Sequence, residues 1–176
     1  MSLWDDFLTN QDDLRINKWA HYFPIYERHL QRFRNLDVTL LEIGVNHGGS
    51  LKLWKRFLGP YAKIVGIDIN PQCVKAEEEQ IQIRIGSQSD GAFLDGLLDE
   101  IGIPDIVIDD GSHVMKDVNV TFDYLYPKLL KNSVYLVEDL HTAYWEEYGG
   151  GAGKPDSFIE RCKHFIDVLN ADHSRG

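Results

Sequence analysis

Residues 38–50 read VTLLEIGVNHGGS, and this stretch carries the most informative local pattern of the chain. It opens with a short apolar run of the kind that forms a buried strand. Glycines then follow at Gly44, Gly48 and Gly49, where the backbone can turn tightly and approach a ligand. A helix is expected from about Ser50. The stretch therefore predicts a strand, a tight turn and a helix in immediate succession.

The same alternation continues along the chain. Short runs rich in β-branched residues predict strands over 38–43, 63–69, 81–85, 105–109 and 134–137. The segments between them are long enough for crossover helices, expected over 50–58, 72–79, 91–101 and 114–130, with a last helix over about 157–169. Strands that alternate with helices predict a parallel sheet covered on both faces, a Rossmann-like α/β fold with strand order 3-2-1-4-5.

The length of 176 residues predicts a single domain, since domains average roughly 150 residues. Residues 1–35 are expected to form an N-terminal cap on the main domain of residues 36–176. Within this cap, residues 1–17 show no clear period, whereas Pro24, Tyr26, Leu30 and Phe33 predict a helix over about 24–35.

The net charge of −10 comes from 18 basic and 28 acidic side chains. Such a charge repels nucleic-acid phosphates and an anionic membrane surface, so neither is expected as a partner. Cys73 and Cys162 belong to no CxxC pair and predict reduced thiols. No signal peptide is recognisable at Met1, and no apolar run approaches the ~20 residues of a membrane span. We therefore expect a soluble, cytoplasmic protein.

Ligands of such sheets bind beyond the carboxyl ends of the strands. The first strand ends in Glu42 and the glycine-rich turn, and the second ends in Asp68, which is placed to accept hydrogen bonds from ribose hydroxyls. The turn lacks the GxGxxG pattern of a nicotinamide site. An acid at Glu42 would suit a cationic amino-acid ligand, so the combination favours S-adenosylmethionine. The candidate cofactor residues are Glu42, Gly44, Asn46, Asp68, Ile69, Ser87, Gln88 and Asp109.

Two roles remain open for the end of the third strand, GSQSD over residues 86–90. Ser87 and Gln88 could contact an adenine edge, and Ser89 or Asp90 could cap the following helix. The two roles are compatible.

Acidic residues follow the fourth and fifth strands, in DDGSH over 109–113 and VEDLH over 137–141. Neighbouring strands would bring Asp110, Glu138 and Asp139 together, and neither segment holds a Lys or Arg. Crowded carboxylates need a cation, and their oxygens suit Mg²⁺ or Mn²⁺. His113 is the first candidate for a general base that takes a proton from an alcohol, and His141 is the alternative.

These motifs carry a family resemblance over about residues 15–170. LEIGVNHGGSLKLW, IVGIDI, DIVIDDGSH and VYLVEDLHTAYWEEYGGG resemble the metal-dependent class I methyltransferases that O-methylate sugars in antibiotic pathways, including the macrolide-sugar and rhamnosyl enzymes. They are also similar to the cephalosporin hydroxylase group. Asp110 and Glu138 stand 28 residues apart in the most specific pairing of motifs, D-G-S-H with V-E-D.

The resemblance implies a class I methyltransferase fold with Asp110, Glu138 and Asp139 as magnesium ligands and His113 as the base. It implies Glu42, Gly44 and Asp68 as cofactor contacts, and it places residues 17–22 (NKWAHY) near the active site without individual roles. The family fold continues with an antiparallel pair of strands, which this sheet is expected to lack. An uncovered edge would favour a homo-oligomer.

The leading hypothesis is a Mg²⁺- and S-adenosylmethionine-dependent O-methyltransferase acting on a sugar hydroxyl of a glycoside or polysaccharide. A hydroxylase-like or redox protein on the same fold and a non-catalytic binding module are the alternatives. The glycine-rich stretch 149–153 is interpreted either as a loop closing over the acceptor or as a flexible connector.

Overall fold

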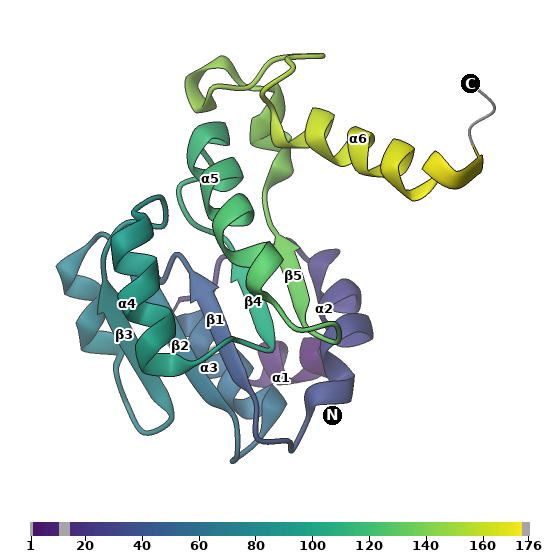
Figure 1. Cartoon of the computed structure of the whole chain (residues 1–176). Coiled ribbons are helices and arrows are strands. Elements are labelled where there is room, and N and C mark those ends of the chain that lie inside the picture. Colours follow the sequence, from purple (N-terminus) through teal and green to yellow (C-terminus); the bar gives the residue numbers. More distant parts are fainter. Residues whose placement is uncertain (1, 11–14, 174–176) are drawn as a thin grey trace.

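The computed structural model describes residues 2–10 and 15–173 of the chain (Figure 1). Its five strands form one parallel sheet in the order β3-β2-β1-β4-β5. The strands are β1 (Thr39–Ile43), β2 (Lys63–Asp68), β3 (Ile81–Ile85), β4 (Ile106–Asp109) and β5 (Val134–Val137). The predicted strand order is confirmed, and the observed strand ends lie within one residue of the predicted ones.

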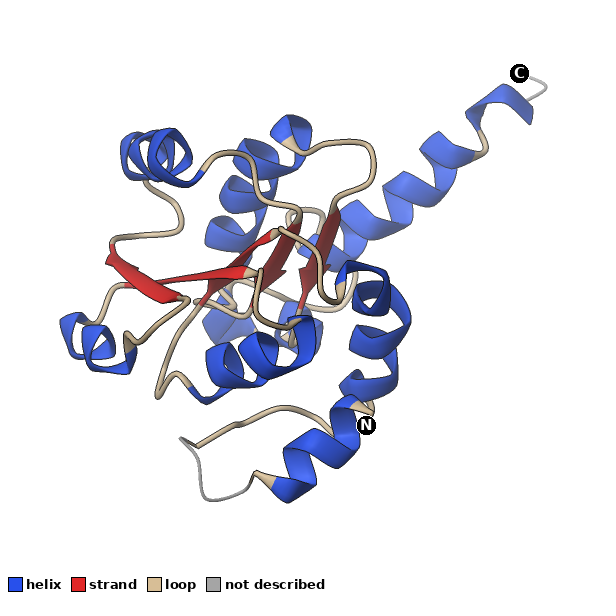
Figure 2. Ribbon diagram, turned by 90° about the horizontal axis from the view of Figure 1, so that it is seen from below, coloured by secondary structure: helices blue, strands red, loops and turns tan. Residues whose placement is uncertain are grey.

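Helices cover both faces of the sheet (Figure 2). The α-helices are α1 (Leu3–Thr9), α2 (Tyr22–Leu30), α3 (Gly49–Leu58), α4 (Gly91–Ile101), α5 (Met115–Leu125) and α6 (Phe158–Leu169). Short 3₁₀ turns are η1 (Gln31–Phe33), η2 (Pro71–Ala76), η3 (Tyr126–Lys128), η4 (Leu140–Tyr144), η5 (Glu146–Tyr148) and η6 (Ala171–His173). In Figure 1, α6 extends away from the sheet.

Four helical predictions differ from the structure. The helix predicted over about 24–35 begins earlier, at Tyr22, and gives way at Gln31 to the 3₁₀ turn η1, so Pro24 is not its first residue. Helix α1 forms where no period was recognised, because Ser2 and Asp5 make a reciprocal capping box at its start. The crossover predicted over 72–79 is only the 3₁₀ turn η2, and the chain is already extended at Glu77. The helix predicted over 114–130 ends as α5 at Leu125, because Pro127 cannot continue an α-helix.

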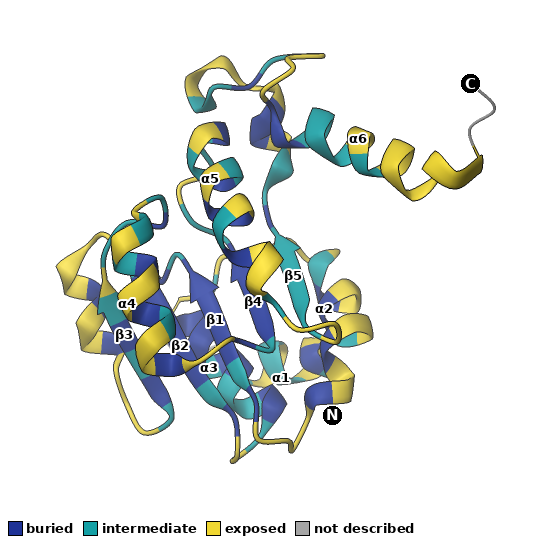
Figure 3. Cartoon of the chain, in the orientation of Figure 1, coloured by how far each residue is buried: buried dark blue, intermediate teal, exposed yellow. Residues whose placement is uncertain are grey.

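Successive residues of each strand point to opposite faces of the sheet, and this divides the core. Leu40 and Ile108 pack with the side chains of α1, α2 and α3, whereas Leu41 and Val107 pack with those of α4. The central strands are buried, and exposure concentrates on the outer faces of the helices and the far end of α6 (Figure 3). The same alternation continues into the polar residues that follow each strand.

The glycine-rich stretch after η5 is docked on the preceding turn. The N–H groups of Gly150 and Gly151 donate to the carbonyl oxygens of Trp145 and Ala143, each at 2.9 Å. A side chain at Gly150 would lie 2.4 Å from the Ala143 oxygen, so only glycine fits there. These hydrogen bonds argue against the interpretation of stretch 149–153 as a flexible connector.

Among the described residues, no helix combines the length and apolar character needed to cross a membrane.

The packing of α1 can be tested by two leucines of the same helix. Leu3 is fully buried and Leu8 is 51% exposed. We expect Leu3→Ala to lower the free energy of unfolding by about 2–5 kcal/mol, because it leaves a cavity. Leu8→Ala should change it by no more than about 0.5 kcal/mol. Urea unfolding measures both, and equal losses would contradict the packing of α1 on the core.

Candidate functional site

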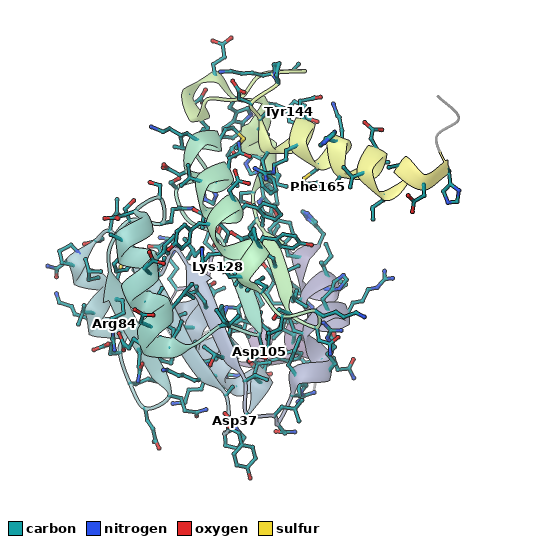
Figure 4. The ribbon with its side chains drawn as sticks, viewed as in Figure 1. Asp37, Arg84, Asp105, Lys128, Tyr144 and Phe165 are labelled. Carbon is teal, nitrogen blue, oxygen red and sulfur yellow. The ribbon has the colours of Figure 1, made fainter. Side chains whose placement is uncertain are left out.

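The site lies at the carboxyl ends of the strands. In Figure 4, Asp37 and Asp105, which precede β1 and β4, lie in the lower half of the view, and Tyr144, which follows β5, lies near the top. Three adjoining cavities occupy the Tyr144 end, where the loops after the strands gather. We call them the first, second and third cavity and define each by its residues.

The first cavity, of about 220 Å³, lies over β1, β2 and β3. Five of the eight predicted cofactor residues line it, namely Gly44, Asp68, Ile69, Ser87 and Gln88. Asn46 lines the second cavity. Glu42 and Asp109 line none of the three cavities and are buried beneath them. Asp90 caps α4 by accepting from the N–H groups of Ala92 and Phe93.

Asp68 holds the glycine-rich turn in shape. Its Oδ2 accepts from the N–H groups of Val45 at 2.9 Å and Asn46 at 3.2 Å, and its Oδ1 accepts from Asn70 at 2.8 Å. Burial raises the pKa of Asp68, but these backbone donors outweigh it, so that the pKa is lowered overall. Asp68 is therefore a fixed, ionised acceptor at the rim of the first cavity.

Gly44 joins the first cavity to the second. Its φ is +90°, and a Cβ at this position would lie 2.1 Å from the backbone oxygen of Asp110. No side chain fits, since the obstacle is backbone and cannot turn away. The turn after β1 thus packs directly on the segment that carries the reactive residues.

The second cavity, also of about 220 Å³, brings together Asp110, His113 and Asp139. One ligand atom from each lies within 4.8 Å of the others. The His113 Nε2 is 3.8 Å from Asp110 Oδ1 and 3.9 Å from Asp139 Oδ2. Opposite ligands of Mg²⁺ are roughly 4 Å apart, and carboxylate oxygens are the ligands it prefers. The donor set therefore fits a hard divalent cation after small side-chain movements.

Backbone strain accompanies this cluster. Asn46, His113 and Asp139 are three of the five described residues other than glycine that have a positive φ. All three line the second cavity. Such conformations cost about 1–3 kcal/mol each and persist only where the surroundings impose them. The three strained residues therefore all contribute to the lining of the second cavity.

A lysine lies behind the carboxylates. Nζ of Lys18 is 2.6 Å from Asp110 Oδ2, 2.9 Å from Glu138 Oε1 and 3.3 Å from Glu42 Oε1. The Lys18 side chain is only 2% exposed. Lys18 comes from a distant segment and supplies a positive charge to acids whose own strand-end segments hold no Lys or Arg. Glu138 turns its Oε1 to Lys18 and lines the third cavity.

The two-residue period of the strands explains this convergence. Each of the three acids stands two residues after an apolar residue that faces α1–α3. The pairs are Leu40 and Glu42, Ile108 and Asp110, and Leu136 and Glu138. The three carboxylates therefore project to the face on which the N-terminal segment lies. Glu42 completes its contacts by accepting from Ser50 Oγ at 2.8 Å. Burial raises the pKa of Glu42, and the nearby Lys18 charge opposes this rise.

Asp109 points to the opposite face and holds Gln88. Gln88 Nε2 donates to Asp109 Oδ1 at 3.2 Å, and Gln88 Oε1 accepts from the Ser112 N–H at 2.7 Å. Burial raises the pKa of Asp109 to about 7, although Gly111, Gln88 and Tyr135 donate hydrogen bonds that lower it. Asp109 therefore orients a residue of the first cavity from below.

The N-terminal segment contributes two residues to which the sequence assigned no role. Besides Lys18, Tyr22 donates from its hydroxyl to Asp139 Oδ1 at 3.1 Å and accepts from the Asp139 N–H at 3.0 Å. Both lie within residues 17–22, so the available signal was the resemblance of that segment to a family element near the active site. The alternative base, His141, has its Nδ1 4.0 Å from Asp139 Oδ1 and lines none of the three cavities.

Removal of the Lys18 charge should destabilise the fold. Lys18→Met leaves buried carboxylates unpaired, and we expect a loss of about 3–5 kcal/mol in the free energy of unfolding at pH 8. Burial raises the pKa of Glu138 in the folded protein. As the pH falls, Glu138 therefore takes up a proton before the protein unfolds, and the repulsion between the unpaired carboxylates decreases. The loss should therefore be smaller at pH 5.

Lys55→Met is the matched control for this experiment. Lys55 pairs with Glu78 at 2.9 Å on the surface, and its loss should cost no more than about 1 kcal/mol at either pH. Urea unfolding at both pH values measures the two variants. A Lys18→Met variant as stable as Lys55→Met would contradict the central role of the buried ammonium.

Comparison with known proteins extends these observations. No protein-family model matches the chain. Demethylmacrocin O-methyltransferase of Streptomyces fradiae is 41% identical over 165 residues, which cover 86% of this chain and 41% of the relative. The 8-demethyl-8-alpha-L-rhamnosyl tetracenomycin-C 2'-O-methyltransferase of Streptomyces olivaceus is 40% identical over 143 residues, 76% of this chain and 37% of the relative. The chain thus spans about two fifths of the length of these relatives.

A solved structure agrees with the sequence matches. The MycE methyltransferase from the mycinamycin biosynthetic pathway, in complex with Mg, SAH and mycinamycin VI, superposes with a TM-score of 0.85 at 33% sequence identity. The match covers 99% of this chain and 46% of that protein. The chain is accordingly a homologue of the sugar O-methyltransferases of macrolide and tetracenomycin pathways and has their class I methyltransferase fold.

Proposed function

We propose that the protein is a Mg²⁺-dependent O-methyltransferase that moves the methyl group of S-adenosylmethionine to a sugar hydroxyl of a glycosylated small molecule. One observation carries this proposal: the first cavity adjoins the second, which gathers Asp110, His113 and Asp139. Gly44, Asp68 and Gly111 line both cavities. A cofactor in the first cavity would therefore extend to the reactive side chains.

The proposed cofactor contacts follow from the lining of the first cavity. Asp68 keeps its ionised carboxylate at the rim, where it can accept hydrogen bonds from ribose hydroxyls. Ser87 and Gln88 would lie along the adenine edge, and Gln88 is held by Asp109 from below. Glu42 would support the cofactor site without contacting the cofactor, because its two carboxylate oxygens already bind Lys18 and Ser50.

The metal would be held by Asp110 and Asp139, whereas Glu138 pairs with Lys18 and lines the third cavity. Bound Mg²⁺ supplies Lewis acidity, which lowers the pKa of an alcohol and fixes its oxygen. Lys18 would take one oxygen of Asp110 and leave the other facing His113. Tyr22 fixes Asp139 through its two hydrogen bonds. The chain's own residues thus hold both carboxylates in place before any ion arrives.

His113 would act as the base. Its Nε2 points between Asp110 and Asp139, so a hydroxyl placed against these carboxylates can pass its proton to Nε2. Loss of that proton turns a poor nucleophile into a good one, and the held geometry aligns its oxygen with the methyl group. His113 has a positive φ and lines the second cavity together with both carboxylates.

Binding of S-adenosylhomocysteine, the form of the cofactor that remains after methyl transfer, tests the proposed function. We expect S-adenosylhomocysteine to bind the chain in calorimetry with a micromolar Kd, on the order of 8 kcal/mol of binding free energy. Asp68→Asn should weaken it by about tenfold or more, whereas Asp95→Asn, an exposed change on α4, should leave it within about twofold. Absence of binding to the wild-type chain would overturn the proposed function.

Two variants separate metal binding from proton transfer. Asp110→Ala removes a carboxylate oxygen, so the Mg²⁺ concentration for half-maximal activity should rise by about tenfold or more. His113→Ala should leave that concentration within about twofold and lower kcat by about 100-fold or more. Methyl transfer to glycosylated acceptors at varied Mg²⁺ measures both. Unchanged kcat in His113→Ala would move the role of base to another group.

A further inference from the structure

The three cavities lie in a row. The second shares Gly44, Asp68 and Gly111 with the first, and it shares Asn17 and Asp139 with the third. The first and third share no residue. Methyl transfer requires the acceptor oxygen to approach the methyl group from the side opposite the sulfur. With the cofactor in the first cavity and the reactive groups in the second, the acceptor belongs on the side of the third.

The third cavity, of about 250 Å³, has an aromatic edge. Trp19 lines it together with Asn17, Glu138 and Asp139. Trp19 is 54% exposed and Trp145 is 45% exposed, whereas Trp54 in the core is fully buried. Trp19 therefore leaves about half of its surface open at the third cavity, and Trp145, which lines none of the three cavities, is open to a similar degree.

His141 connects these two indoles. Its ring centroid is 4.9 Å from that of Trp145 and 6.0 Å from that of Trp19, with interplanar angles of 72° and 81°. Its Nδ1 lies 4.0 Å from Asp139 Oδ1. The three rings therefore form a continuous aromatic border that begins at a candidate metal ligand. They come from segments more than 120 residues apart.

We infer that Trp19 and Trp145 form a stacking platform for the sugar ring of the acceptor, an inference that rests on the proposed function. One face of a pyranose carries C–H groups, whose partial positive charge suits the negative face of an indole. The hydroxyls at the ring edge then remain free to reach Asp139 and His113. An uncharged sugar also suits this border, because the adjacent carboxylates would repel an anionic acceptor. His141 acts as the spacer that sets the separation of the two indoles.

The test uses methyl α-L-rhamnopyranoside, a sugar without an aglycone, and protein saturated with S-adenosylhomocysteine and Mg²⁺. Titration by NMR gives the affinity for the sugar, and calorimetry gives the affinity for S-adenosylhomocysteine. Trp19→Ala and Trp145→Ala should each weaken sugar binding by about tenfold or more, with S-adenosylhomocysteine binding within about twofold of wild type. Trp145→Phe keeps an aromatic face and should stay within about threefold.

Tyr61→Ala provides the control. Tyr61 is 66% exposed and precedes β2, at the end of the sheet away from the site, so both affinities should remain those of wild type. Equal sugar affinity in wild type and both alanine variants would overturn the platform, as would a wild-type chain that binds S-adenosylhomocysteine but no rhamnoside. Failure of the wild type to bind S-adenosylhomocysteine would instead overturn the proposed function and this inference with it.

Discussion

The buried ammonium of Lys18 is the interaction on which the site depends. It ties together Glu42 of β1, Asp110 after β4 and Glu138 after β5, at distances of 2.6–3.3 Å. Burial alone would lower the pKa of Lys18, but the three carboxylates more than offset this effect and raise it. The lysine therefore stays charged, and the ends of three strands are held against the N-terminal segment.

The pleat of the sheet assigns each acid to one of two tasks. Residues in phase with Leu40 and Ile108 project toward the N-terminal segment and meet Lys18. Asp109 is out of phase, and it supports Gln88 in the first cavity from the other face. Close packing of Gly44 on the Asp110 backbone joins the two tasks, because neither segment can shift alone. The charge of −10 thus includes a few acids with structural duties and many at the surface.

The N-terminal segment completes the site from outside the sheet. Lys18 balances the carboxylates, Tyr22 fixes Asp139, and Trp19 borders the third cavity. Its position is set by α2, whose buried Phe23 and Tyr26 pack in the same core as α1 and Trp54. The cavities proposed for the cofactor, the metal and the acceptor adjoin one another in that order at the carboxyl ends of the strands, so the acceptor would meet the cofactor at the metal.

The sequence predicted the five strands and their parallel order, because the hydrophobic period is local and the alternation of strands with helices restricts the topology. It also predicted that Asp110, Glu138 and Asp139 come together with His113 beside them; Asp110, Asp139 and His113 do so, whereas Glu138 turns to Lys18. The identity of the cation that meets the acids depends on tertiary packing. Lys18 and Glu138 are 120 residues apart, and no local pattern encodes an approach over that separation. The contacts of Glu42 likewise depend on packing. The pleat directs its side chain away from the first cavity, and the N-terminal segment brings Lys18 to that same face of the sheet.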